Sequence, residues 1–281
     1  MAGIDLAAIA RRAGKRRPVI VRDIRPPAML ATDLFQAAYA PMLAAWEAAI
    51  AQDGPIMAAY RLSLSQITAD APADIQGAVD NAERSIFSIF LTLTPRLSDW
   101  ALKLERWHRG KWIAAVLAAS SVNLGTMIGP DAARMTLEAA IARNVGLVRS
   151  ISDEARARIS AAVFDGLRNR TPADEVARQL RAAVGMGRDR ARRVASDQLA
   201  KLTSALADER RREVGITEWQ WLHSGKRHPR PEHVARDGNI YSDNPARVGG
   251  SIMGEKIAAP PQDRPGQLPY CGCRSRSVID I

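Results

Sequence analysis

Apolar residues recur at helical spacing over most of this chain, from about residue 32 to residue 214. The first stripe consists of Phe35, Tyr39, Leu43, Trp46 and Ile50. Similar stripes cover residues 75–93 and 97–117. Aromatic residues make up only 5% of the chain, while alanine is abundant up to about residue 207, a composition that favours helices packed through small residues. The sequence therefore predicts a mainly α-helical body.

Capping and breaking residues divide the second half of this body. A helix is expected over residues 131–143, and Ser152 is placed to cap a new one. Pro172 suits the first turn of a second helix, which Gly185-Met186-Gly187 is expected to end. A third helix should follow over residues 188–214.

The aromatic residues near residue 110 invite a different interpretation. Trp107, His108 and Trp112 resemble the lining of a cofactor site, but aromatic residues at near-helical spacing are usually packing residues. We therefore assign them to the core.

The character of the sequence changes after Gly215. Short runs rich in aromatic and β-branched residues predict strands at residues 218–222, 239–241 and 273–281. Between the last two, many prolines and glycines indicate loops. The fold class we expect is a mainly α-helical body with a small C-terminal α+β domain that is rich in loops.

These changes predict four segments. They are a flexible basic arm (1–31), an N-terminal helical region (32–143), a second helical region (144–215) and a small α+β part containing Cys and His (216–281). Prolines at positions 18, 26 and 27 prevent a continuous helix in the second half of the arm. A terminus without any partner is the alternative interpretation of this arm.

The chain is basic, with 40 Lys and Arg against 30 Asp and Glu, for a net charge of +10. Two groups of basic residues are candidates for contact with DNA or with an acidic protein surface. They are Arg11, Arg12, Lys15, Arg16 and Arg17 in the arm, and Arg188, Arg190, Arg192 and Arg193 at the expected start of the third helix. A solvated surface without a partner explains the charge equally well.

Membrane and secretory signals are not found in the sequence. No run of 18 apolar residues is present, and the first residues lack the order of a signal peptide, so we expect synthesis in a cytoplasm and no membrane partner. The two cysteines are too close in sequence to form a relaxed disulfide with each other.

Histidines and cysteines gather in the last quarter of the chain. The candidate residues for a structural or metal site are His223, His228, His233, Asp237, Cys271 and Cys273. Thiolate and imidazole are ligands that zinc prefers, so a structural zinc is one candidate cofactor. Buried thiols that pack beside a hydrogen-bonded histidine are the alternative. No hydrolase, metalloprotease or phosphate-loop motif is present, so no residue is assigned a catalytic role.

The same region carries a resemblance to a known family. Its motifs are Trp219-x-Trp221, Ser224 to His233, Asp237 to Tyr241, and Pro269 to Arg274. In this order, behind a helical region that begins near residue 140, they resemble the phage Mu F-like head morphogenesis family. The family's usual His-Pro-Asn-Cys-Arg-Cys ending is here Leu-Pro-Tyr-Cys-Gly-Cys, so one potential metal ligand is missing unless His223 or His228 replaces it. Its usual Ala-Arg-Thr-Glu reads Ala-Ser-Asp-Gln at residues 195–198.

The resemblance implies a minor head protein of a tailed bacteriophage or prophage. The partners it implies are the portal protein, other head proteins and double-stranded DNA bound without sequence preference during capsid assembly and DNA packaging. Its implied location is the virion head, after synthesis in the cytoplasm of a bacterial host. We expect no enzymatic activity; the alternative is a phage-derived metal-dependent nuclease or toxin-like enzyme.

Overall fold

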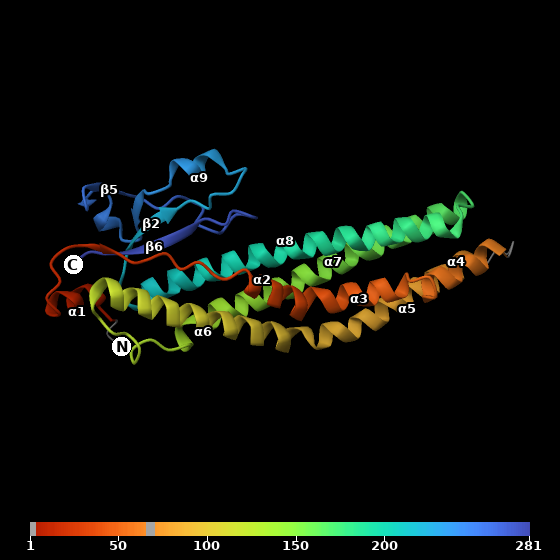
Figure 1. Ribbon diagram of the computed structural model, residues 1–281, viewed down its shortest axis with the longest axis horizontal. Helices are drawn as coiled ribbons and strands as arrows, with labels where there is room; N and C mark the ends of the chain where they lie inside the picture. Colours follow the sequence, from red (N-terminus) through yellow and green to blue (C-terminus); the bar gives the residue numbers. More distant parts are fainter. Residues whose placement is uncertain (1–3, 66–70) are drawn as a thin grey trace. The chain divides into compact units, whose positions relative to one another are not determined.

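The computed structural model describes residues 4–65 and 71–281 and confirms a mainly helical protein with a small α+β part (Figure 1). Its α-helices are α1 (Leu6–Arg12), α2 (Met29–Leu34), α3 (Ala40–Ala49), α4 (Pro55–Ser65), α5 (Ala71–Leu91), α6 (Leu93–Ser120), α7 (Arg134–Arg168), α8 (Ala173–Glu213) and α9 (Pro231–Ala235). Its strands are β1 (Val19–Ile20), β2 (Glu218–Leu222), β3 (Ile240–Ser242), β4 (Ser251–Ile252), β5 (Glu255–Ala258) and β6 (Arg274–Ile279). Phe35–Tyr39 form a π-helical turn, and Asp131–Ala133 and Pro245–Arg247 form 3-10 turns. Within the described residues, no helix is both long enough and apolar enough to span a membrane.

The chain folds into two compact units, and each is built from separate stretches of sequence. Unit 1 comprises Met1–Leu30, described from Ile4, together with Ala101–Ala140 and Ser196–Ile281. Unit 2 comprises Ala31–Trp100, without residues 66–70, and Ile141–Ala195. This division differs from the four consecutive segments expected from the sequence because α6, α7 and α8 each contribute residues to both units.

Unit 2 is a helical assembly in which α7 and α8 run side by side and α3 lies beside α5 (Figure 1). Hydrogen bonds connect its helices across more than a hundred residues of sequence. The Trp46 indole donates to the Ser152 hydroxyl at 3.0 Å, and the Tyr60 hydroxyl donates to the Thr171 carbonyl, in the turn between α7 and α8, at 2.6 Å. These bonds satisfy polar groups that packing removes from water.

Two helix boundaries expected from the sequence are wrong. Ser152 lies inside α7 and caps nothing, because its hydroxyl accepts the Trp46 hydrogen bond. The glycines at 185 and 187 lie inside α8, which runs without interruption through them. A helical glycine costs only about 1 kcal/mol relative to alanine. The buried stripe that includes Val184 and Ala191 continues on both sides and holds the helix together.

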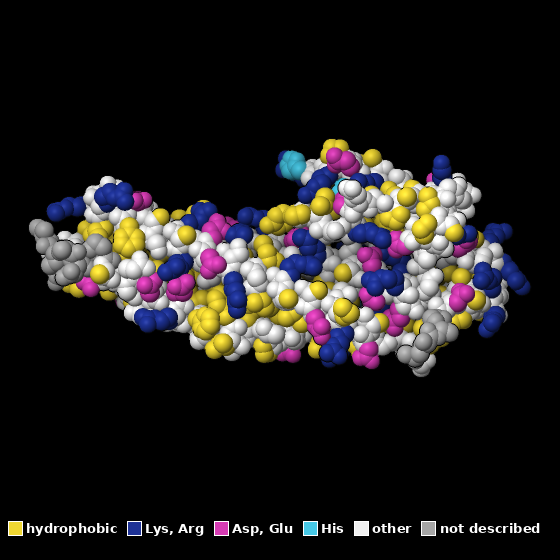
Figure 2. Space-filling view, turned by 180° about the vertical axis from the view of Figure 1, so that it is seen from behind, with side chains coloured by type: hydrophobic (Ala, Val, Ile, Leu, Met, Phe, Trp, Pro, Cys, Tyr) yellow, Lys and Arg dark blue, Asp and Glu magenta, His cyan; other side chains and the backbone are white. Residues whose placement is uncertain are grey.

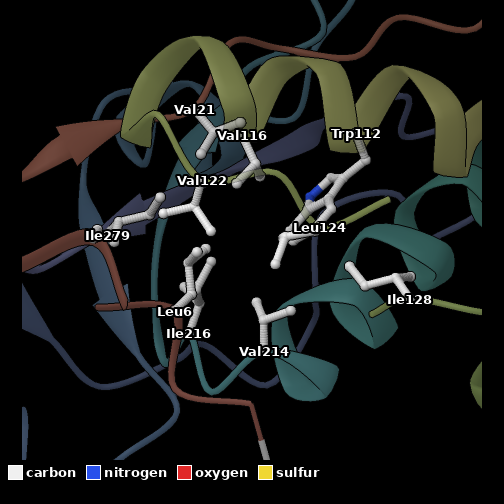
Figure 3. Close-up of a cluster of buried hydrophobic side chains, with 11 residues drawn as sticks. Leu6, Val21, Trp112, Val116, Val122, Leu124, Ile128, Val214, Ile216 and Ile279 are labelled. Atoms are coloured by element: carbon white, nitrogen blue, oxygen red, sulfur yellow. The ribbon is translucent and has the colours of Figure 1, made fainter. Parts of the chain in front are cut away.

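Unit 1 contains an apolar core to which distant parts of the chain contribute (Figure 3). Leu6 comes from α1, Trp112 from α6, Val214 from the turn after α8 and Ile279 from β6, and each is at most 1% exposed. Val122, Leu124 and Ile128, in the segment after α6, complete the cluster in the view of Figure 3. Trp112 is thus a packing residue.

The expectation of a mobile basic arm is wrong for residues 4–30. Val19 and Ile20 pair with Ile279 and Val278 as an antiparallel edge strand, and Leu6 is buried in the core. Apolar residues interspersed among the basic ones provide this anchoring, while the prolines delimit a two-residue strand.

The sheet of unit 1 has the strand order β1-β6-β2-β3-β5-β4. The strands expected at 218–222, 239–241 and 273–281 are confirmed as β2, β3 and β6. β1, β4 and β5 were not expected, since runs of two to four residues give too little alternation to detect.

Unit 1 also buries charge. Arg210 and Glu105 form an ion pair with both side chains 0% exposed, and Arg210 donates at 3.0 Å to the Gly129 carbonyl. His108 is only 1% exposed, and neither ring nitrogen has a hydrogen-bond partner among the described residues. Burial, followed by the positive charges of Arg210 and Arg211, lowers the pKa of His108 to about 3. His108 is therefore a neutral interior residue.

Candidate functional site

The pairing of β2 with β6 brings the Cys- and His-containing segments together. In this antiparallel ladder, Trp221 is paired with Ser275 and Leu222 with Arg274. His223 therefore follows the last paired residue of β2, and Cys273 immediately precedes the first paired residue of β6. The short helix α9, near β2 in Figure 1, carries His233 to the same place.

His233, Cys271 and Cys273 form one compact cluster. One potential ligand atom from each residue lies within 4.8 Å of the other two. Nδ1 of His233 is 3.2 Å from Sγ of Cys271 and 3.6 Å from Sγ of Cys273. The three residues are 3%, 5% and 1% exposed, respectively, so the cluster is almost entirely removed from solvent.

A carboxylate on the far side of the ring orients His233. Asp263 Oδ2 lies 2.8 Å from His233 Nε2, and Arg236 donates to the other oxygen of Asp263 at 2.7 Å. Because Asp263 accepts the Nε2 proton, Nδ1 presents its lone pair to the sulfurs. Burial alone would raise the pKa of Asp263, but the hydrogen bonds and charge of Arg236 and the bond from His233 lower it.

The Cys271-Gly272-Cys273 turn has a fixed conformation. Gly272 has φ +70°, a left-handed conformation that glycine adopts without steric cost, and the Cys273 N–H donates to Sγ of Cys271 at 3.4 Å. The preceding residue, Tyr270, is held from two sides. Its N–H donates to Asp197 of α8 and its carbonyl accepts from Lys226, both at 2.5 Å.

The two thiols shift each other's pKa in opposite directions. A hydrogen bond from the Cys273 thiol lowers the pKa of Cys271 to about 5, although burial opposes this; the backbone N–H groups of Cys273 and Gly266 contribute further. The pKa of Cys273 is raised by three effects: its hydrogen bond to Cys271, burial, and the nearby charge of Cys271. A buried site that already favours one thiolate is suited to a cation.

Aromatic side chains pack against one side of the Cys/His cluster. The Trp221 ring meets the His233 ring edge-on at 5.2 Å between centroids, and the Arg236 guanidinium lies 5.0 Å from the centre of Trp221. Trp219 stacks on Tyr241 at 4.8 Å beyond it. Both tryptophans are 0% exposed, and Trp221 fixes the position of His233 by packing against its ring.

The other candidate ligands lie outside this group of three. Asp237 accepts a hydrogen bond at 2.8 Å from the backbone N–H of His223 and thereby stabilises the loop after β2. His223 and His228 line a pocket together with the cluster residues. The sequence analysis missed Asp263, although it is the only acidic residue between Glu255 and Asp280, a signal that could have been noticed.

The two basic groups have different surroundings. Arg188 pairs with Glu47 and Arg190 with Glu154, and Arg192 lies over the Phe35 ring at 5.6 Å. Arg193 is exposed. All four lie within α8 and not at the start of a helix, where the sequence analysis placed them.

The N-terminal basic residues are more accessible. Arg11, Arg12, Arg16 and Arg17 are exposed, and Lys15 is half-buried. On the face shown in Figure 2, Lys and Arg side chains are interspersed with Asp and Glu. The net charge is therefore not concentrated in one continuous patch on that face.

The architecture defines a class: long helices joined to a small α+β part whose buried Cys/His cluster lies between β2, α9 and β6. Residues 157–276 match the family described as Phage Mu protein F like protein, which confirms the resemblance over that segment. The match supports a phage head morphogenesis protein and a phage-associated location.

One relative among curated proteins adds no functional information. It is a Haemophilus influenzae protein described as "Uncharacterized protein", 28% identical over 146 residues. The alignment covers 51% of this chain and 30% of that protein, so the chain spans under a third of the relative's length. No solved structure matches this chain.

Proposed function

We propose that this chain is a minor head protein that assembles with the portal and other head proteins of a tailed phage or prophage. The observation that carries this proposal is the Mu F-like match over residues 157–276, a segment that includes all of α8 and the Cys/His cluster. Assembly would occur in the cytoplasm of a bacterial host, and the protein would reside in the virion head.

An exposed apolar pair on α5 supports contact with another head protein. Phe87 is 59% and Leu91 is 71% exposed, and residues four apart lie on the same face of a helix. Burying both would contribute about 1.5 to 3 kcal/mol for each side chain. We propose this face for portal contact.

The exposed arginines near the N-terminus support contact with packaged DNA. Arg11, Arg12, Arg16 and Arg17 can neutralise phosphates without reading bases. Arg188 and Arg190 are less suited, because Glu47 and Glu154 already pair with them. We therefore place the DNA contact at the N-terminal group.

We propose a structural role for the Cys/His cluster, not a catalytic one. Both ring nitrogens of His233 have partners within the protein, and its side chain is almost fully buried. A general base must reach the proton it abstracts. Incubating the purified chain with plasmid DNA and divalent metals tests this proposal, and cleavage that Cys271→Ser abolishes would establish the nuclease alternative.

Native mass spectrometry of the chain mixed with the portal protein of the same phage or prophage tests the assembly proposal. We expect a stoichiometric complex, which the double variant Phe87→Ser/Leu91→Ser weakens at least tenfold. The control Met135→Ser changes another exposed apolar residue, 81% accessible on α7, and should leave binding unchanged. Failure of the unaltered chain to bind the portal protein would refute the assignment.

DNA binding needs its own experiment. We expect duplexes of any sequence to compete in proportion to length, with affinity falling steeply as salt rises. Changing Arg11, Arg12, Arg16 and Arg17 to Gln should lower both the affinity and the salt slope, whereas Arg134→Gln, in an exposed pair with Glu138, should not. An unchanged slope in the fourfold variant would exclude this surface.

A further inference from the structure

The distances within the Cys/His cluster fit a tetrahedral metal site. Bond lengths of about 2.3 Å for zinc to sulfur and 2.0 to 2.1 Å for zinc to nitrogen place ligand atoms of one ion about 3.5 to 3.8 Å apart. Nδ1 of His233 is 3.2 and 3.6 Å from the two sulfurs. Both nitrogen–sulfur distances are therefore within about 0.4 Å of those in a tetrahedral zinc site.

The chemistry of the three donors selects among metals. Two thiolates and an imidazole are soft to intermediate ligands that suit zinc, whereas magnesium and calcium require oxygen. No carboxylate belongs to the group of three. Two thiolates also neutralise the charge of a divalent ion, which makes its burial beside the Trp221 ring favourable.

His233 is already oriented as a metal ligand. Metal-binding histidines commonly donate the second ring N–H to a carboxylate, which fixes the tautomer and raises ligand basicity. Asp263 accepts from Nε2 at 2.8 Å and is itself held by Arg236 at 2.7 Å, which leaves Nδ1 directed at the sulfurs.

The turn at Cys271-Gly272-Cys273 resembles a loop that binds a metal ion through two thiolates. Gly272 at φ +70° directs the Cys273 N–H to Sγ of Cys271, and such hydrogen bonds stabilise a thiolate. The three residues line a pocket together with His223 and His228, the two histidines available for a fourth coordination position. His223 is a weaker candidate for it, because its Nδ1 accepts from the Gly225 N–H at 3.2 Å and its neutral ring then carries the proton on Nε2.

We infer that His233, Cys271 and Cys273 bind one zinc ion, with Asp263 as the residue that positions His233. Binding replaces the thiol protons, which pass to solvent, by two sulfur–zinc bonds and one nitrogen–zinc bond without any change of oxidation state. The ion links α9 to the segment before β6. This inference does not depend on portal or DNA contact.

The full chain, purified under reducing conditions, tests the site directly. We expect one zinc per chain by elemental analysis. After removal by a chelator, cobalt(II) should restore one ion per chain and produce thiolate-to-cobalt charge-transfer absorption. Cys273→Ser and His233→Ala should lose this absorption, while the matched control His223→Ala, from the same pocket, should retain it. A reduced wild-type chain that takes up neither ion would overturn the inference, as would full uptake by Cys273→Ser.

A second test uses only the wild-type chain, so its result does not depend on whether the variants fold. Zinc should protect both cysteines from alkylation by iodoacetamide under native conditions, and chelation should increase their reactivity at least tenfold. Alkylation rates that are the same with and without chelator would contradict the site.

Discussion

Asp263 Oδ2 lies 2.8 Å from Nε2 of His233, so a residue in a proline-rich loop fixes the histidine of the Cys/His cluster. Asp263→Asn keeps the size of this side chain but weakens the acceptor. We expect zinc affinity to fall by about 10- to 100-fold, as removal of such outer partners usually does. Competition with a chromophoric chelator measures the change. Asp237→Asn is the control and should leave affinity unaltered, since that side chain braces a backbone N–H.

Breaking the buried Arg210–Glu105 pair should destabilise unit 1. Glu105→Gln removes the fully buried counterion of Arg210, which still pairs with Glu213, and we expect a loss of about 3 kcal/mol in the free energy of unfolding. Glu138→Gln breaks the exposed pair with Arg134 and should cost less than about 0.5 kcal/mol. Urea titrations of both variants test the difference, and equal midpoints would contradict it.

His108 makes stability depend on pH. Its pKa is about 3 in the folded chain and 6.5 ordinarily, so between these values only the unfolded chain takes up the proton. The contribution of this residue is fully present above pH 6.5 and is lost as the pH falls toward 3, by about 2 kcal/mol at pH 5. His108→Phe should remove this part of the pH dependence of the free energy of unfolding. That free energy should be measured at pH 7 and at pH 5 for the wild type and for His108→Phe. An equal decrease in both proteins would show that His108 does not cause the pH dependence.

Two glycines of α7 should respond in opposite ways to alanine. A Cβ at Gly166 would lie 2.6 Å from Val176 Cγ2 and 2.9 Å from the Tyr60 hydroxyl, whereas one at Gly146 would meet nothing within 4 Å. We expect Gly166→Ala to cost about 1 to 3 kcal/mol by overpacking. Gly146→Ala should stabilise by about 0.5 to 1 kcal/mol through helix propensity. Thermal unfolding tests this, and the opposite order of midpoints would contradict the packing described around Tyr60.

Periodic features of the fold could be predicted from the sequence. The stripes over 75–93 and 97–117 correspond to α5 and α6, and β2 and β6 lie where aromatic and β-branched residues alternate. Helix boundaries were less predictable, because local signals compete with packing. The Ser152 hydroxyl accepts from Trp46, 106 residues away, and no capping rule contains that information.

The same distinction holds for the candidate site. His233, Cys271 and Cys273 could be selected by residue type alone, and the structure brings them together. Asp237 was chosen because it lies near the histidines in sequence. The carboxylate that contacts the His233 ring is instead that of Asp263, 30 residues further along the chain. Loop residues carry no periodicity that would indicate which of them approaches the ring.

The pairing of β1 with β6 has a consequence for the order in which the protein forms. Asp23 meets Arg274 at 2.9 Å across 251 residues of sequence. At about 5 to 20 residues per second, the ribosome needs roughly 10 to 50 s to add that length of chain. During this interval Leu6 and Val21 have been synthesised, but their partners in β6 have not. The sheet can therefore be completed only after β6 has been synthesised, and chains that stop before β6 leave an apolar edge exposed to aggregation and proteolysis.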